Sequence, residues 1–183
     1  MSRRTEMLYA ETQRFRQWWF LALVGVIILL DGWLVIAVQG WAVVQQVVLA
    51  VPWGNNPASD GVLLSLTLVW GVLFPIWLLA LKLEVQVWTD GVHLRFWPLH
   101  LGWVHIAAST VASFEAGTYR PIRSYGGWGL RWGVRNGRRG KAYNVSGNQG
   151  VMLLLDDGRH VTIGSLEPDQ LAAAIQRMID RRP

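Results

Sequence analysis

The 183-residue chain contains no cysteine, and this absence excludes several kinds of chemistry at once. Without thiols there can be no disulfide bond, no thiolate ligand for zinc and no cysteine nucleophile. Charged residues are also scarce, at 16% of the sequence, whereas 52% of the residues are hydrophobic. A chain this apolar is typical of proteins that place part of their sequence in a lipid bilayer.

The motifs of common catalytic sites are missing as well. The sequence has no GxSxG elbow and no P-loop spacing, and its glycine-rich phrase GWGLRWGVRNG lacks the strand-to-helix context of a dinucleotide loop. His93, His100 and His105 come from adjacent predicted strands, but no histidine has a carboxylate at the spacing of a HExxH-type motif, and isolated strand histidines usually serve packing. We therefore predict no catalytic residues, no metal site and no cofactor.

The few charges divide the chain into unlike parts. Residues 18 to 81 carry only Asp31 and Asp60, whereas residues 82 to 183 carry 13 of the 17 lysines and arginines. This distribution predicts a cytoplasmic N-terminal segment at 1–17, a transmembrane hairpin at 18–81 and a cytoplasmic domain at 82–183 with its own core.

Two apolar runs within the hairpin, 18–38 and 62–81, are each long enough to cross a bilayer as a helix. The linker between them, 39–61, contains no lysine or arginine, whereas four arginines precede the first run and Lys82 follows the second. Because positive charges favour the cytoplasmic side, the pattern predicts a multi-pass protein of the cell membrane with both termini in the cytoplasm.

Asp31 is the one ionisable residue within the two predicted spans. Ser65 and Thr67 are expected at a similar depth on the second span, so a hydrogen bond between the two helices is the favoured interpretation. An ion or proton path is the alternative, since acidic groups inside a membrane often have such roles.

After Lys82 the hydrophobic pattern changes to a period of two, which is typical of β-strands. Tight turns are predicted at Thr89-Asp90-Gly91 and Asp156-Asp157-Gly158. An apolar stripe at helical spacing follows Ser165 and predicts a C-terminal helix. Strands are predicted at 83–87, 92–96, 101–106, 111–117, 129–135, 141–145, 151–155 and 159–163.

The stretch from Tyr119 to Gly150 is the most distinctive part of the sequence. It has seven positive charges and no acidic residue, with glycines and aromatic residues between them. This mixture suits phosphate headgroups or an acidic protein surface, although a solvated basic hairpin is an equally simple interpretation. The candidate anion- and lipid-binding residues are Arg120, Arg123, Arg131, Arg135, Arg138, Arg139 and Lys141.

The phrases VTIGSLEPDQLAAAI, YRPIRSYGGWGLR, AYNVSG and GVMLLLDDG resemble those of bacterial pleckstrin-homology-like domains that follow a pair of transmembrane helices, and of one small uncharacterised branch among them. The resemblance extends from about residue 15 onward. It implies a partly open β-barrel capped by a helix, and it implies no catalytic residues. Related eukaryotic domains hold phosphoinositides in a basic loop between the first two strands, but Thr89-Asp90-Gly91 has no basic residue in this chain.

These observations predict a membrane-anchored α+β protein: a two-helix transmembrane hairpin followed by a PH-like β-barrel of about seven strands with a C-terminal capping helix. The expected function is a non-enzymatic interaction or scaffold module at the inner leaflet, contacting anionic lipid. Its expected partners are membrane lipids and either another protein or a second copy of the chain, with no nucleic acid. The alternatives are an accessory subunit of an integral membrane complex, which would use Asp31 and the helices, and an enzyme with an unrecognised site.

Overall fold

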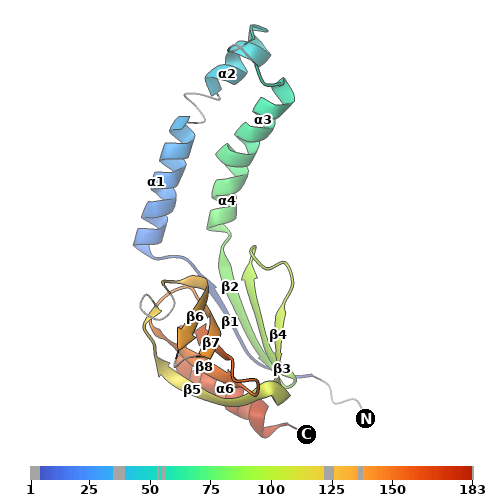
Figure 1. The fold of residues 1–183 in the computed structure, drawn as a ribbon, viewed down its shortest axis with the longest axis vertical. Coiled ribbons are helices and arrows are strands. Elements are labelled where there is room, and N and C mark those ends of the chain that lie inside the picture. The colour runs from blue at the N-terminus through green and yellow to red at the C-terminus, as the bar shows by residue number, and fades with distance from the viewer. Residues whose placement is uncertain are drawn as a thin grey trace. The chain divides into compact units, whose positions relative to one another are not determined.

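A computed structural model of the chain describes residues 5–34, 40–52, 54, 57–121, 126–135 and 138–182. The chain divides into two compact units (Figure 1). The β-unit combines Met1–Phe15 with Leu81–Pro183, and the apolar unit is Arg16–Ala80.

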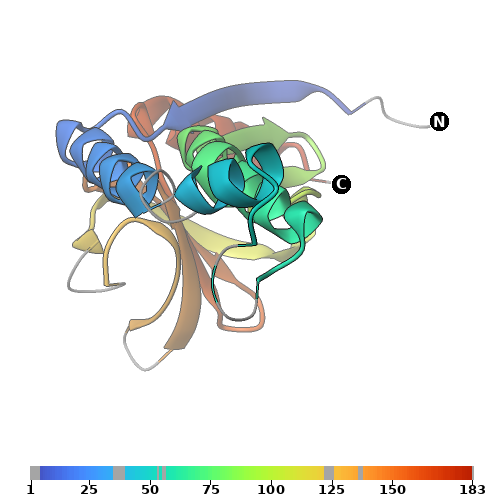
Figure 2. The same cartoon turned by 90° about the horizontal axis from the view of Figure 1, so that it is seen from above.

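The N-terminal segment contributes a strand to the β-unit. Strand β1 (Met7–Arg14) pairs antiparallel with β2 (Lys82–Trp88), and the two strands lie side by side in Figures 1 and 2. The sequence predicted a separate segment at 1–17; the structure instead includes most of it in a sheet. Because Arg14 lies opposite Lys82, the chain leaves the first sheet at the end of β1 and returns to it at the start of β2, with the whole apolar unit in between.

The first sheet has the strand order β1-β2-β3-β4. Its remaining strands are β3 (Gly91–Trp97) and β4 (Val104–Ala107). Thr89 and Asp90 form the predicted tight turn between β2 and β3, because Trp88 lies opposite Gly91. Side chains along β2 alternate between the buried Leu83, Val85 and Val87 and less buried neighbours, as expected for a strand with one face on the core.

The second sheet has the strand order β5-β8-β9-β7-β6. A short 3₁₀ turn at Ala108–Thr110 leads into it from β4. Its pairs are antiparallel except for β7 and β9, which run parallel. Its strands are β5 (Val111–Thr118), β6 (Gly129–Arg135), β7 (Arg138–Asn144), β8 (Gln149–Leu155) and β9 (His160–Gly164).

The C-terminal helix α6 (Pro168–Asp180) contacts strands of both sheets. It buries the predicted apolar stripe, represented by Leu171, Ile175 and Met178. Ser165 has a role at the start of the helix, since its Oγ accepts a hydrogen bond from the Glu167 N–H at 3.0 Å. The helix therefore joins the two sheets into one core.

The predicted PH-like barrel is wrong. The described residues form nine strands in two open sheets of four and five, and no strand pair joins one sheet to the other. A barrel needs its edge strands to pair with each other. Instead, β4 pairs only with β3 within the described chain, and β6 pairs only with β7. The fold is therefore an α+β sandwich-like arrangement that stays open at its edges.

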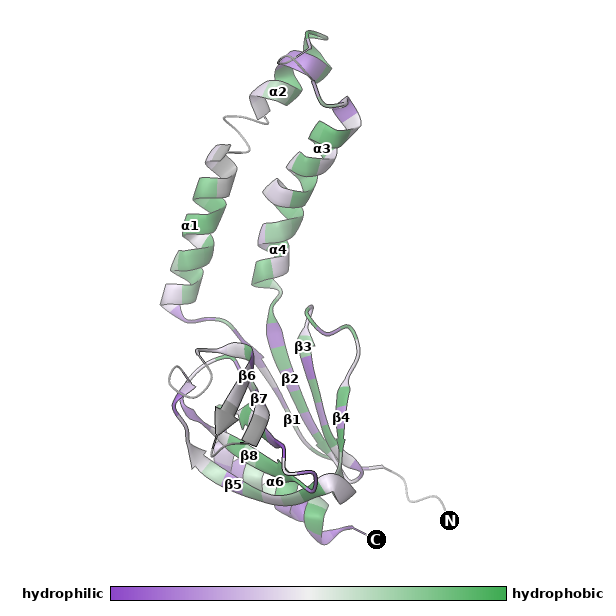
Figure 3. Cartoon of the chain, in the orientation of Figure 1, coloured by the Kyte–Doolittle hydropathy of each residue, from purple (hydrophilic) through white to green (hydrophobic). Residues whose placement is uncertain are grey.

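The described residues of the apolar unit form three helical segments. Helix α1 spans Trp18–Leu34, and α2 (Trp41–Val43) continues as a π-helical turn at Val44–Val48. The third runs unbroken over Asp60–Leu79 as α3 (Asp60–Leu68), a π-helical turn (Val69–Leu73) and α4 (Phe74–Leu79). Its residues are mostly hydrophobic, as the colouring of the ribbon in Figure 3 shows, and only 6% of its most apolar stretch is buried.

The predicted two-helix transmembrane hairpin is also wrong for the described part of the chain. Within it, only Asp60–Leu79 is long and apolar enough to cross a membrane, and this helix matches the predicted span 62–81 with a shift of two residues. Helix α1 has 17 residues, a rise of about 25 Å compared with the ~30 Å of a bilayer core. The described residues therefore do not support a multi-pass topology.

Candidate functional site

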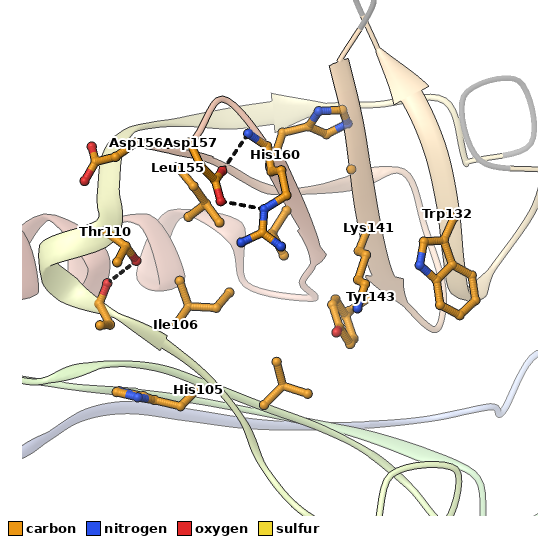
Figure 4. A pocket seen from close by; sticks show the side chains of 15 residues that line it. His105, Ile106, Thr110, Trp132, Lys141, Tyr143, Leu155, Asp156, Asp157 and His160 are labelled. Atoms are coloured by element: carbon orange, nitrogen blue, oxygen red, sulfur yellow. Dashed lines mark hydrogen bonds and ion pairs between the residues drawn. The ribbon is translucent and has the colours of Figure 1, made fainter.

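A pocket of about 510 Å³ lies within the β-unit, between β4 and the strands β7 and β9 (Figure 4). This volume falls in the range of small-molecule sites. Its walls are mainly apolar and include Val104, Ile106, Tyr143, Leu155 and Val161. Four of these five side chains are less than 10% exposed, Val104 being the exception. An apolar group that enters the pocket would therefore be removed from water.

The open edge of the first sheet explains why the pocket exists. Strand β4 has only four residues and pairs, within the described chain, only with β3. Its successive side chains face opposite ways, so Ile106 faces the pocket while the His105 ring is directed away from it, as Figure 4 shows. The space that a closing strand pair would fill is thus left as a cavity.

An ion pair occupies one side of the pocket rim. The Arg159 backbone N–H donates to Asp157 Oδ1 at 2.9 Å, and Arg159 Nε donates to Oδ2 at 2.6 Å. These hydrogen bonds, the backbone one first, hold the pKa of Asp157 below its ordinary value. The charge of Arg159 is therefore already compensated by its neighbour in the same turn.

Lys141 and Trp132 form the other side of the rim. They are cross-strand partners on β7 and β6, and the Lys141 Nζ lies 5.7 Å from the centre of the Trp132 ring. Trp132 is 68% exposed, unusually high for a large aromatic residue. Among the described residues no carboxylate lies within ion-pair distance of Lys141, so its charge is available to an anionic ligand.

His160 and Tyr143 contribute buried rings to the pocket wall. The His160 ring lies directly against the backbone of Gly140, where any Cβ would overlap it. Tyr143 is 1% exposed, and burial raises the pKa of its hydroxyl because the charged phenolate would lose its hydration. Tyr143 is therefore a neutral wall residue, and Lys141 supplies the positive charge on its side of the pocket.

The structure places the predicted basic residues on several elements. The β6–β7 hairpin carries Arg131, Arg135, Arg138, Arg139 and Lys141, and Arg135 lies opposite Arg138. Like charges at opposite positions of a strand pair are unfavourable unless an anion offsets them. The side chains of Arg135, Arg138 and Arg139 lie outside the described residues.

Arg120, Arg123 and Arg131 complete the predicted basic set, and none of them is among the described residues that line the pocket. Arg120 is exposed just after β5, and Arg123 lies outside the described residues. Arg131 Nε donates to the Trp128 carbonyl at 3.1 Å. Of the seven predicted basic residues, only Lys141 is among the described residues that line the pocket.

The predicted intramembrane polar group is only partly described. Ser65 Oγ donates to the Gly61 carbonyl at 2.6 Å and Thr67 Oγ1 to the Leu63 carbonyl at 2.9 Å. Both hydroxyls thus bond within their own helix, a common arrangement for apolar helices. The side chain of Asp31 lies outside the described residues, so its pairing with Ser65 or Thr67 stays a prediction.

Sequence reasoning did not identify the pocket. Its lining comes from positions between Val104 and Val161 on several strands and turns, and no local pattern marks such a set. The Asp156-Asp157-Gly158 turn was predicted as a turn but not as part of a rim. Among the features noted in the sequence, Trp132 within the basic stretch gave the best indication of the pocket, because its side chain lies at the rim.

The chain belongs to DUF6141, a family of unknown function, whose sequence profile matches residues 2–180. No curated protein and no solved structure matches the chain. The family therefore covers both units, including strand β1, and leaves the activity to be argued from the site.

Proposed function

We propose that the chain is a non-enzymatic, membrane-associated binding module that contacts anionic lipid through the β6–β7 hairpin and the adjoining pocket. The observation that carries this proposal is the pair of Lys141 and Trp132 at the mouth of an apolar-walled cavity. A lysine beside an exposed tryptophan suits the headgroup level of a membrane, where indole rings and basic side chains both gather.

The connection to the apolar unit supports a lipid ligand over a free one. The helix Asp60–Leu79 ends three residues before β2 begins at Lys82. A β-unit attached in this way is held within a few nanometres of any membrane that the helix enters. Weak contacts with headgroups then become effective, because the tether removes much of the entropic cost of association.

The basic hairpin supports an anionic ligand. Five of its residues are basic and none is acidic. Each lysine or arginine close to an anionic surface contributes about 1 kcal/mol, and the attraction fades over a Debye length of about 8 Å at physiological salt. The mixed lining of the pocket, with an apolar floor below Lys141, fits a headgroup joined to the upper part of an acyl chain.

The test needs a protein without the apolar helix, which would insert into vesicles by itself. Because Arg14 and Lys82 are cross-strand partners, residues 16–80 can be replaced by a short glycine-containing turn; we call this protein the linked β-unit. Flotation with vesicles should show binding that requires anionic lipid and weakens as salt is raised.

A double variant, W132A with K141Q, should bind anionic vesicles at least about fivefold more weakly, since one charge and one aromatic anchor are lost. R177Q, which removes an exposed arginine on α6, is the matched control and should bind like the parent. Equal binding by the double variant, or no binding of the parent at low salt, would refute lipid contact at this hairpin and favour a protein partner.

A further inference from the structure

His93 and His105 lie against each other on neighbouring strands, with Asp90 beside them. The two histidines are cross-strand partners on β3 and β4, and their ring centroids are 4.4 Å apart. His93 Nε2 is 3.4 Å from Asp90 Oδ1, and His105 Nε2 is 3.8 Å from Asp90 Oδ2. One donor atom from each residue lies within 4.8 Å of the others.

The backbone around Asp90 is fixed from both sides. Its carbonyl accepts a hydrogen bond from Ala108 N at 2.8 Å, which joins the turn to the end of β4. In the same turn, Thr89 N donates to the Glu6 carbonyl at 3.0 Å, next to β1. These bonds fix the backbone of the turn, so the Asp90 carboxylate starts from a defined Cα position close to both histidines.

Gly91 provides the room that the arrangement needs. A Cβ at this position would lie 2.6 Å from His105 Nε2 and would also overlap the Ile106 carbonyl. Because Gly91 has no side chain, the His105 ring extends over the strand towards Asp90. Its backbone does not require glycine for a left-handed conformation, since its φ is not among the positive ones.

The donor set has the chemistry of a transition-metal site. Zinc bound at about 2.0–2.1 Å in tetrahedral geometry places its ligand atoms roughly 3.3–3.5 Å apart. The His93 contact, at 3.4 Å, lies in this range, whereas the His105 contact, at 3.8 Å to the other Asp90 oxygen, would shorten when the metal binds. Two imidazoles favour zinc, copper or nickel over calcium and magnesium, which prefer oxygen ligands. Hydrogen bonds from the two imidazole rings to the two Asp90 oxygens are the alternative arrangement, and zinc binding distinguishes the two.

We infer that Asp90, His93 and His105 form a three-ligand site for a divalent transition metal, with zinc as the representative ion. Three protein ligands leave a fourth position for water or for a donor from another molecule. The side chains of Asp90 and His105 are 42% and 44% exposed, so this position is open to solvent. A bound metal would join the β2–β3 turn to β4, the edge strand that forms one wall of the pocket.

This inference goes beyond the proposed lipid contact and does not use Lys141 or Trp132. It also departs from the expectation that the chain has no metal site. That expectation considered His100 together with the other two strand histidines, but His100 lies against Tyr143 with ring centroids 6.1 Å apart. The residue that completes the cluster is the turn aspartate, which the sequence indicated only as part of a hairpin.

The test is zinc binding to the full chain in detergent, purified with a tag free of histidine and treated with a chelator. Titration calorimetry should show one zinc per chain. D90N, H93Q and H105Q should each bind zinc at least about tenfold more weakly, because loss of a ligand should cost no less than loss of an outer-shell partner, which already lowers metal affinity about 10–100-fold. D156N and H100Q, which remove a carboxylate and an imidazole elsewhere, should bind like the parent.

A second readout separates metal binding from loss of folding. Zinc should raise the unfolding temperature of the parent and of D156N but not of D90N, because a ligand stabilises the state that binds it. All variants should have the same unfolding temperature as the parent without metal. The inference is overturned if the parent binds no zinc, or if a double variant, H93Q with H105Q, binds it as tightly as the parent.

Discussion

Glu11 on β1 accepts a hydrogen bond from Ser165 Oγ at 2.7 Å, joining two residues that are 154 positions apart. Its other carboxylate oxygen accepts the Leu166 N–H at 2.8 Å. Nearby, the buried Gln13 side chain donates to the Gly164 carbonyl at 2.7 Å. Strand β1 is therefore tied both to β2 and to the segment that leads into α6, which makes the N-terminal residues part of the core.

The linked β-unit is predicted to fold without the apolar unit. Its two halves meet where Arg14 pairs with Lys82, so a short turn restores an ordinary hairpin. Urea unfolding followed by circular dichroism should show a single cooperative transition.

A fragment of residues 81–183 alone is the informative comparison. It lacks β1 and therefore leaves the edge of β2 unpaired and the Ser165 segment without Glu11. We expect it to unfold at much lower urea or to aggregate. If this fragment were as stable as the linked β-unit, the hydrogen bonds of β1 would be dispensable for the stability of the core.

Replacing Glu11 by alanine should lower the free energy of unfolding of the linked β-unit by about 1–3 kcal/mol, because it removes part-buried and exposed hydrogen bonds to a charged group. E11Q should cost less, because the amide oxygen can still accept some of the hydrogen bonds that Tyr9, Ser165 and Leu166 donate to Glu11. Glu115, which is exposed on β5, gives the matched control; a comparable loss in E115A would show that the effect is not specific to the β1 contact.

Glu84 is predicted to make stability depend on pH. Burial favours its neutral form, but hydrogen bonds from Arg95 Nε at 2.6 Å and Lys82 Nζ at 2.7 Å outweigh this and hold its pKa below the ordinary value. Since the unfolded chain then binds the proton more readily, the stabilisation is present above the ordinary glutamate pKa and disappears as the pH falls through the lower folded value. The urea midpoint of the linked β-unit should exceed that of E84Q at neutral pH, and the two should converge in acid. A constant difference at all pH values would contradict this.

Gly140 is predicted to be intolerant of a side chain. A Cβ would overlap the His160 ring, so G140A must displace this buried imidazole and should destabilise the linked β-unit by about 1–3 kcal/mol. Gly117 also lies in a strand, but a Cβ there meets nothing within 4 Å. The difference between the unfolding free energies of G140A and G117A in urea measures the cost of the clash between the added Cβ and the His160 ring. Equal unfolding free energies would show that His160 moves aside at no cost.

Local patterns predicted the elements well. Alternation in Leu83, Val85 and Val87 identified β2, and the apolar stripe through Leu171 and Met178 identified α6. These signals are readable because one face of each element is buried and the other is not. The tight turn at Thr89 and Asp90 was predicted for the same reason, with strands on either side.

Long-range pairing was not readable in the same way. Strand β1 has a mixed burial pattern with one fully buried residue, Gln13, so it gave no clear alternation. The parallel pairing of β7 with β9 joins strands separated in sequence by β8. No local sequence pattern in either strand indicates which strand it pairs with. For this reason the sheet order, the open edges and the pocket could be obtained only from the structure.

The pairing of β1 with β2 also constrains the order in which the chain can fold during synthesis. The ribosome releases β1 first, and its partner follows only after the whole of Arg16–Ala80 has been made. Strand β1 cannot pair until β2 has been synthesised. Bringing the two strands together then closes a long loop, which slows folding. The helix Asp60–Leu79 is therefore synthesised in full before β1 and β2 can pair, so any insertion of this helix into a membrane can precede assembly of the first sheet.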